Sequence, residues 1–566
     1  MKRYGYIEQD LSGYPLAAWI WGHRLRVGQH WMEYLLEFLN VLAGFDYELG
    51  QGITEGAEVP SSKLEYTRFT RLGLRRFVFY DEREKTRHPF DDLARQQLQQ
   101  ALLAQVNVAS ANSTTDPLAF VRGVLRSFSA VEEQRSWYAK SLFPAHHSML
   151  FWEGLRKGAT KYKGRRVLES TPPMVLDAEV AFDPRNFFAR GGEIYYLVLS
   201  AGTQQRLDQR DLIATRLRTL LVERNQAIGR LAETIDTTWQ QLAASPTAQH
   251  AQRREHTGRL GWIPEPDCPL YAIFAEDVAT FLGASLDPLE TLDLLGHLIG
   301  FHLTVYIYYH ANLIASHIDG SDSTESQFQR LALLVDAMDG SDSGVIRDVS
   351  AALFREQEAL IIQRARTYVD EQVQGWMESL TTGGPSALWL EAKEHFHLSS
   401  LRSATRRPFE QRFDGLLLRY TRGQIDQDGF LEQFTILLMD ILMGDFRKNF
   451  LGVHSKLAKR VGFVAPRKGA SGRFVLGDTL LKTLTLANVP VDTEMPFDLF
   501  LDRLHERYGI IVGPDQARQS GLFRRQSINA EYYDRNKAAL LEKLERAGLA
   551  VEYSDATAIV RATLHQ

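Results

Sequence analysis

The chain has 566 residues, which at roughly 150 residues per domain corresponds to three or four domains. Its apolar and charged fractions, 44% and 24%, are those of a globular protein, and its formal net charge of -5 excludes a protein that is basic over its whole surface. A single cysteine, Cys268, excludes an intrachain disulfide and a cysteine-based zinc site. The first ten residues lack the apolar core of a secretion signal, so we expect a cytoplasmic protein.

The first predicted elements are aromatic helices. Apolar residues recur at helical spacing in the block "AAWIWGHRLRVGQHWMEYLLEFLNVL", and we expect them to pack in a core. They are Trp19, Trp21, Leu25, Trp31, Leu35, Phe38, Leu39 and Leu42. Further on, residues 66–80 carry four arginines followed at once by acidic residues, which indicates a surface helix or strand.

A short basic segment follows in the sequence "RKGATKYKGRR", which has no acidic residue and two glycines. We interpret it as a flexible loop that is either solvated or in contact with phosphates. Its cations are Arg156, Lys157, Lys161, Lys163, Arg165 and Arg166.

The middle of the chain predicts long helices. Residues 210–252 read as one long polar helix with an apolar side suited to packing on a neighbouring helix. Residues 294–318 have no acidic or basic residue except histidine, and we expect a buried helix because His297, His302 and His310 would be costly in hydrocarbon. The spacing of these histidines does not suit a shared metal ion, so we interpret them as core and interface residues.

Two loop signals follow. Asp319-Gly-Ser-Asp-Ser323 recurs as Asp339-Gly-Ser-Asp-Ser343, a spacing that resembles the metal-ion-dependent adhesion site of von Willebrand factor A domains. The strand and helix alternation of that fold is missing here, so we expect loop or capping roles. The cluster of glycine, proline and serine at residues 381–386 predicts the main domain boundary.

The strongest charge feature lies between Asp445 and Asp478, where no acidic residue interrupts eight cations. Apolar residues from Phe450 to Phe463 recur at near-helical spacing, which places the cations of this helix on its opposite face. We predict a DNA-contacting surface, with a solvated charged face as the alternative. The cations are Arg447, Lys448, Lys456, Lys459, Arg460, Arg467, Lys468 and Arg473.

The C-terminal sequence predicts three helices and a hairpin. We expect the first helix at residues 480–489, the second to start at Pro496, and the third at residues 531–547. Gly548 ends the third helix, and two short strands follow it. This order, ending in "LLEKLERAGLAVEYSDATAIV", resembles the winged-helix version of the helix-turn-helix fold. The resemblance implies that residues 531–547 form the recognition helix, whose mixed charges suit phosphate contact poorly, so a protein-docking role stays open.

A second resemblance concerns the whole chain. The aromatic N-terminal block and the block "NFFARGGEIYYLVLS", with the winged-helix-like end, resemble uncharacterised proteins encoded in bacterial anti-phage defence clusters beside ATPases or helicases. The resemblance implies a setting and a type of partner, and it transfers no functional residue.

The sequence offers no local catalytic motif. It has no Walker lysine loop, no His-Glu-x-x-His, no Gly-x-Ser-x-Gly and no paired cysteines, and we name no catalytic residue, metal ligand or cofactor. The leading hypothesis is a non-enzymatic subunit that contacts duplex DNA without sequence specificity and docks an ATPase, helicase or nuclease partner, away from membranes. The alternatives are a cryptic metal-dependent nuclease or other hydrolase and a pure protein scaffold.

The predicted fold is mainly α, with a multi-helical N-terminal body and a C-terminal helical module that ends in a winged helix with a short β-hairpin wing. The predicted domains are residues 1–200, 201–380, 387–476 and 477–566, in the order of an aromatic-rich helical domain, a domain of long helices, a helical module with the basic segment and a winged-helix-like domain.

Overall fold

The described part of the chain is mainly α-helical, as the sequence predicts. The computed structural model describes residues 15–22, 25, 29–50, 72–79, 95–102, 116–131, 140–150, 161–162, 165–166, 191–242, 263–264, 268–318, 331–338, 344–378, 385–396, 398–401, 403–466, 472–526, 528–553 and 557–562. Both Asp-Gly-Ser-Asp-Ser repeats and most of the predicted linker at 381–386 lie outside the described residues.

The helices follow one another along the whole chain. Those before residue 320 are α1 (Pro15–Trp21), α2 (Trp31–Gly44), α3 (Leu72–Phe79), α5 (Pro117–Arg126), α7 (Gly191–Gly202), α8 (Leu207–Arg218), α9 (Gln226–Leu242), α11 (Pro269–Phe281) and α12 (Pro288–Ile318). Those after it are α13 (Gly344–Glu378), α14 (Pro385–His395), α15 (Ser403–Thr421), α16 (Gln427–Asn449), α17 (Val453–Val461), α18 (Asp478–Asn488), α19 (Phe497–Tyr508), α20 (Pro514–Gln519), α21 (Leu522–Gln526) and α22 (Ala530–Arg546). Short turns of helix are η3 (His147–Met149), η5 (Thr219–Glu223) and η9 (Leu398–Ser400).

The strands are short and form small separate sheets. Antiparallel pairs are β1 (Ser129–Val131) with β2 (Ser141–Leu142), β3 (Lys161–Tyr162) with β4 (Arg165–Arg166), and β6 (Val464–Ala465) with β7 (Arg473–Phe474). A three-stranded antiparallel sheet has the order β10 (Ala550–Glu552), β11 (Ala558–Arg561), β8 (Glu494–Pro496). A parallel pair joins β5 (Leu333–Leu334) to β9 (Ile510–Ile511), across a long stretch of chain.

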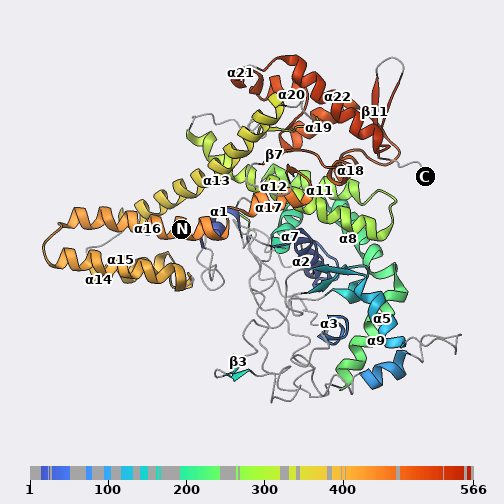
Figure 1. Ribbon diagram of the computed structural model, residues 1–566, viewed down its shortest axis with the longest axis horizontal. Helices are drawn as coiled ribbons and strands as arrows, with labels where there is room; N and C mark the ends of the chain where they lie inside the picture. Colours follow the sequence, from blue (N-terminus) through green and yellow to red (C-terminus); the bar gives the residue numbers. More distant parts are fainter. Residues whose placement is uncertain are drawn as a thin grey trace.

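Helix α12 lies at the centre of the body, and the other helices pack around it (Figure 1). Its middle, residues 298–311, is buried on every side, which is why its sequence is apolar all round instead of amphipathic. Helices α2, α13, α17 and α18 contact it. The predicted buried helix is confirmed, and the buried His302 and His310 are core residues as expected. None of the described helices combines the length and the apolar character that a membrane span needs.

The predicted aromatic stripe is buried in the core at every residue except Trp19, whose side chain lies outside the described part. Trp21 is fully buried, stacks on Phe446 and Phe450 with ring centroids 5.7 and 4.5 Å away, and donates its indole N–H to the carbonyl of Ile307 at 3.1 Å. Tyr306 donates its hydroxyl back to the carbonyl of Trp21 at 2.9 Å. One continuous buried cluster joins residues from all four predicted domain ranges, and their division into separate domains stays a prediction.

The prediction of one helix over residues 210–252 is wrong for its described part. Helix α8 passes into the π-helical turn η5, the chain bends, and α9 starts at Gln226. The break lies at Asn225, whose φ of 53° is left-handed and whose side-chain amide donates to the carbonyl of Ala145 at 3.0 Å. Asparagine tolerates this conformation better than most residues, so a local side-chain contact overrides the helical pattern.

The C-terminal elements follow the predicted order. Helices α18, α19 and α22 begin and end within two residues of the predicted bounds, Gly548 ends the last with a φ of 70°, and β10 and β11 form the hairpin. Strand β8, just before α19, adds a third strand, and β9, α20 and α21 lie between the second and third predicted helices. The assignment to the winged-helix fold stays a prediction.

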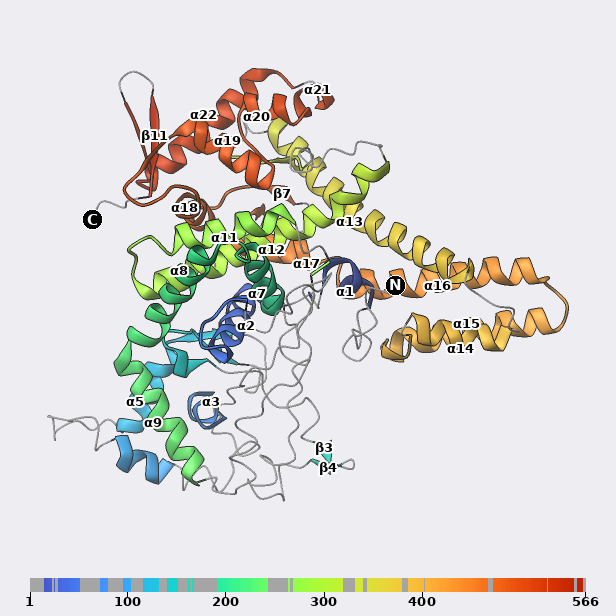
Figure 2. The ribbon, with the colours of Figure 1, turned by 180° about the vertical axis from the view of Figure 1, so that it is seen from behind.

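Helices α14 and α15 and the greater part of α16 project from the body as an arm, alongside the C-terminal part of α13 (Figures 1 and 2). Trp376 of α13 packs against Phe434 of α16, and Trp389 of α14 stacks on Phe413 of α15 at 4.6 Å. The arm therefore has an aromatic core of its own that continues into the body along α13 and α16.

Candidate functional site

The acid-free basic segment, residues 446–477, runs from the end of α16 through α17 into β6 and β7. Arg447 and Lys448 are exposed in the last turn of α16, and Lys456 is exposed on α17. None of these three forms an ion pair or a side-chain hydrogen bond with another described residue. Cations in the last turn of a helix are also favoured by the helix dipole, which is the structural explanation for Arg447 and Lys448.

Two other cations of the segment hold the fold together instead of facing solvent. Arg460 donates to the carbonyl of Gln29 at 3.0 Å and so ties α17 to the residues before α2. Arg473 binds the buried carboxylate of Asp336 at 2.7 Å. Burial raises the pKa of Asp336, and the guanidinium beside it counteracts part of that rise.

The segment therefore splits into two groups. Lys459 is half-buried, near enough to the buried His454 that its charge lowers the pKa of that imidazole, though less than burial does. Arg467 and Lys468 lie outside the described residues. The six described cations of the segment do not all lie on one exposed face, and Arg447, Lys448 and Lys456 are the exposed ones among them.

The second predicted basic element is described only in part. Lys161 lies in β3, and Arg165 and Arg166 lie in β4, which pairs with it. The backbone of these residues thus forms two paired strands of two residues each, whereas the sequence predicted a flexible loop. Arg156, Lys157 and Lys163 lie outside the described residues.

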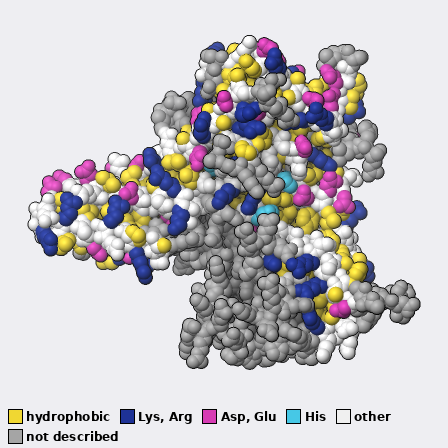
Figure 3. All heavy atoms as spheres, in the orientation of Figure 1, with side chains coloured by type: hydrophobic (Ala, Val, Ile, Leu, Met, Phe, Trp, Pro, Cys, Tyr) yellow, Lys and Arg dark blue, Asp and Glu magenta, His cyan; other side chains and the backbone are white. Residues whose placement is uncertain are grey.

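Three cations of helix α22, the predicted recognition helix, are paired with acidic residues. Arg535 and Arg546 pair with the acidic residues one turn earlier, Glu531 and Glu542, and Lys537 pairs with Asp498 of α19. Such exposed pairs contribute little to stability, but they leave the helix surface electrically mixed. Figure 3 shows acidic and basic side chains interspersed over the visible surface of the C-terminal part and the arm.

The arm carries exposed apolar side chains. Leu390 of α14, Leu418 of α15 and Ile436 of α16 expose 65%, 49% and 51% of their surface. Single exposed apolar residues are normal on a protein surface, and others of this size are exposed elsewhere in the described part.

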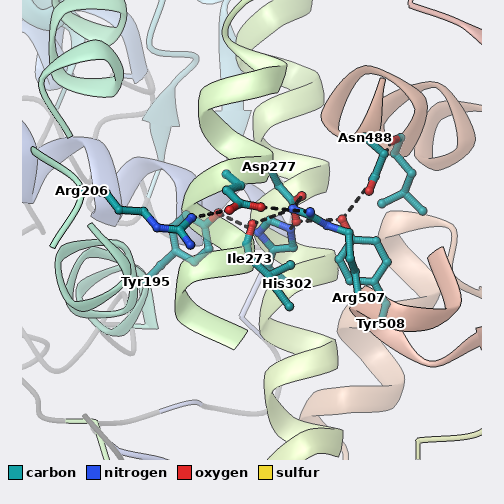
Figure 4. A network of polar contacts seen from close by, with 10 residues as sticks. Tyr195, Arg206, Ile273, Asp277, His302, Asn488, Arg507 and Tyr508 are labelled. Carbon is teal, nitrogen blue, oxygen red and sulfur yellow. Dashed lines mark hydrogen bonds and ion pairs between the residues drawn. The ribbon is translucent and has the colours of Figure 1, made fainter. Parts of the chain in front are cut away.

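A buried polar network lies where the N-terminal, central and C-terminal parts meet (Figure 4). At its centre, the fully buried carboxylate of Asp277 on α11 accepts from His302 of α12 at 3.1 Å, from the hydroxyl of Tyr508 at 2.7 Å and from Arg507. On the far side of the imidazole, Tyr195 of α7 lies 2.8 Å from Nδ1 of His302.

The protons of this network can be assigned one by one. His302 donates from Nε2 to Asp277, so its Nδ1 carries no proton and accepts from the Tyr195 hydroxyl. Tyr508 donates to Asp277, and its own oxygen accepts from the side-chain amide of Asn488 at 3.0 Å. Burial lowers the pKa of His302, against the opposing effect of Asp277, so the imidazole is neutral as this assignment requires.

Arg507 extends the network to the rim of the body. It donates to Glu276 at 3.1 Å and to the carbonyl of Ile273 at 3.1 Å, and Glu276 also binds Arg206. Since Asp277 and His302 have no exposed side-chain surface, the network is a structural junction between helices and not a place where a dissolved substrate meets a catalytic group.

Sequence reasoning missed this junction. Its available signals were an acidic pair, Glu276 and Asp277, inside an otherwise apolar helix, and an arginine-tyrosine pair, Arg507 and Tyr508, just before Gly509. Each signal is weak alone, because the partners lie about 230 residues apart and only the fold brings them together. The chain matches no family of related sequences, no curated protein and no solved structure.

Proposed function

We propose that this chain is a non-enzymatic subunit of a bacterial anti-phage defence or DNA-processing complex. It contacts duplex DNA through its exposed cations and docks a protein partner, an ATPase, helicase or nuclease, through its arm. The setting and the partner rest on the resemblance of the N-terminal blocks and the chain end to proteins of defence clusters.

The observation that carries the DNA contact is the group of exposed cations at the junction of α16 and α17. Arg447, Lys448 and Lys456 lie within ten residues, no acidic residue occurs between residues 446 and 477, and none of the three cations is engaged by another described residue. Positive side chains in this state bind phosphate by displacing condensed counterions. The net charge of -5 makes the site local.

The distribution of charge favours contact with the DNA backbone over reading of the bases. Arg535, Lys537 and Arg546 of α22 are paired, so the helix that would enter the major groove offers little net charge to phosphates. Phosphate contacts position a protein on a duplex without reading its sequence, and we expect slight sequence preference.

The docking role is supported by the arm. It projects from the body, contains its own aromatic core, and exposes Leu390, Leu418 and Ile436. A partner that covers this surface would bury apolar area without any rearrangement of the body.

The test is the salt dependence of binding to a duplex of random sequence, followed by fluorescence anisotropy. Changing Arg447, Lys448 and Lys456 together to Ala is expected to flatten the slope of log K against log salt by about 0.9 for each phosphate that the protein no longer neutralises. The matched control is the triple change of Arg224, Arg366 and Arg407 to Ala, which removes the same charge from exposed positions elsewhere.

Equal effects of the two triple variants would contradict a local site and leave a general charge effect. No binding at low salt would overturn the DNA contact and leave the pure scaffold as the remaining function. Cleavage of a plasmid by the purified protein with Mg²⁺ or Mn²⁺, surviving stringent purification, would favour the nuclease alternative.

A further inference from the structure

Two adjacent histidines and a glutamate from a distant helix come together beside η3. His146 precedes this turn, His147 begins it, and Glu233 lies on α9. One ligand atom from each of the three residues lies within 4.8 Å of the other two. The two imidazole rings are 4.6 Å apart, and Nε2 of His147 lies 3.8 Å from the carboxylate of Glu233.

The buried wall of this cluster is built around the ring of His146. His146 is only 3% exposed, and a Cβ added to Gly229 of α9 would lie 2.5 Å from its Nδ1 and Cε1. Gly229 thus leaves room for the ring to lie flat against α9, one turn before Glu233. Only glycine at position 229 leaves room for the imidazole ring of His146.

Ser148 connects the histidine to the carboxylate. Its hydroxyl donates to Glu233 at 2.9 Å, so the 2.6 Å contact between this hydroxyl and Nδ1 of His146 is made by a proton on Nδ1. The backbone N–H of Ser148 lies 3.2 Å from the same imidazole nitrogen. A buried hydroxyl bonded to a carboxylate fixes the direction in which that carboxylate points, which is the usual task of groups behind a metal ligand.

The other two ligands are partly exposed. The side chains of His147 and Glu233 are 31% and 50% exposed, whereas His146 is fixed. Ligand atoms of a tetrahedral zinc site lie about 3.4 Å apart, given bonds of about 2.1 Å. Binding of an ion therefore requires the ligand atoms to come closer together than they are here.

We propose that His146, His147 and Glu233 bind one Zn²⁺ ion. Two imidazole nitrogens and one carboxylate oxygen are a donor set that zinc accepts, and three protein ligands leave a fourth position for water. The predicted absence of metal ligands rested on local spacing, and this site combines residues 86 and 87 positions apart that no such spacing reveals. The inference is independent of the DNA contact.

The experiment is titration of Zn²⁺ into the full chain after removal of metals with a chelator, followed by isothermal calorimetry. We expect one zinc per chain for the unchanged protein, and an affinity at least tenfold lower for Glu233→Gln and for His147→Gln. Co²⁺ in place of Zn²⁺ is expected to give the visible absorption of a four-coordinate site in the unchanged protein, and this absorption should be absent from both variants.

The matched control is Glu223→Gln, which removes the same charge from an exposed glutamate at the end of η5, just before α9. Its zinc affinity should equal that of the unchanged protein. Glutamine at 233 keeps an oxygen to accept from Ser148, so Glu233→Gln is expected to fold, which circular dichroism checks. No stoichiometric zinc, or equal binding by Glu233→Gln and Glu223→Gln, would overturn the site.

Discussion

Asp277 shows what a single buried charge requires of its surroundings. Its carboxylate has no contact with water, and it is stable there because a guanidinium, an imidazole N–H and a phenol O–H replace hydration. Removing one donor leaves a partner unsatisfied as well, so the cost exceeds that of one average hydrogen bond. Sequence alone predicted that His302 is a core residue but not why, since its hydrogen-bond partners come from α7 and α11.

Changing Tyr508 to Phe tests this junction at the residue scale. The change removes a donor to Asp277 and the acceptor of the Asn488 amide, and we expect the free energy of unfolding to fall by about 1–3 kcal/mol. Urea unfolding followed by circular dichroism measures it. Tyr553→Phe, at a tyrosine that is 45% exposed, should stay within about 0.5 kcal/mol of the unchanged protein, and a similar small effect at Tyr508 would contradict the proton assignment.

At the scale of elements, residues that mark helix ends predicted helix positions well, whereas long apolar patterns predicted them less well. Helices α19 and α22 were placed closely because Pro496 marks the start of the first and Gly548 the end of the second in the sequence. The break between α8 and α9 depends on one contact of Asn225 with Ala145, which no pattern in residues 210–252 records. The sequence also did not reveal that Arg460 and Arg473 of the basic segment bind other parts of the fold, because their partners lie far away in sequence.

Two helical glycines should respond in opposite directions to alanine. On α12, a Cβ at Gly300 would lie 2.5 Å from Cγ1 of Val461, so Gly300→Ala pushes α17 away and should lower the free energy of unfolding by about 1–3 kcal/mol. On α13, nothing lies within 4 Å of a Cβ at Gly375, so Gly375→Ala should raise it by about 0.5–1 kcal/mol through helix propensity. Thermal unfolding of both variants measures the signs, and a stabilising Gly300→Ala would show that α12 and α17 are not in close contact.

For the whole molecule, buried histidines set the response to acid. Burial lowers the pKa of His302 and His505, and it lowers the pKa of His310 and His454 to about 3. Below about pH 6.5 these histidines bind protons in the unfolded chain but not in the folded chain. The stability they contribute is therefore complete above the unfolded pKa and declines as the pH falls below it.

We expect the urea midpoint to fall steadily between pH 6.5 and pH 5, with each buried histidine contributing about 1.4 kcal/mol per pH unit once its unfolded form is protonated. Changing His310 to Gln removes one such group and should reduce the slope of unfolding free energy against pH by that amount. An unchanged slope in His310→Gln would mean that this imidazole titrates in the folded protein as it does in the unfolded chain.

The pairing of β5 with β9 bears on the order in which a ribosome delivers this chain. Residues 333–334 pair with a strand made about 180 residues later, Asp277 pairs with Arg507, 230 residues later, and Gln29 is bound by Arg460, 431 residues later. A nascent chain that ends before residue 511 has its N-terminal and central helices but lacks the pieces that close them. Final closure is thus postponed until residue 511 has been made, and shorter nascent chains present uncovered apolar surface to chaperones and proteases in the meantime.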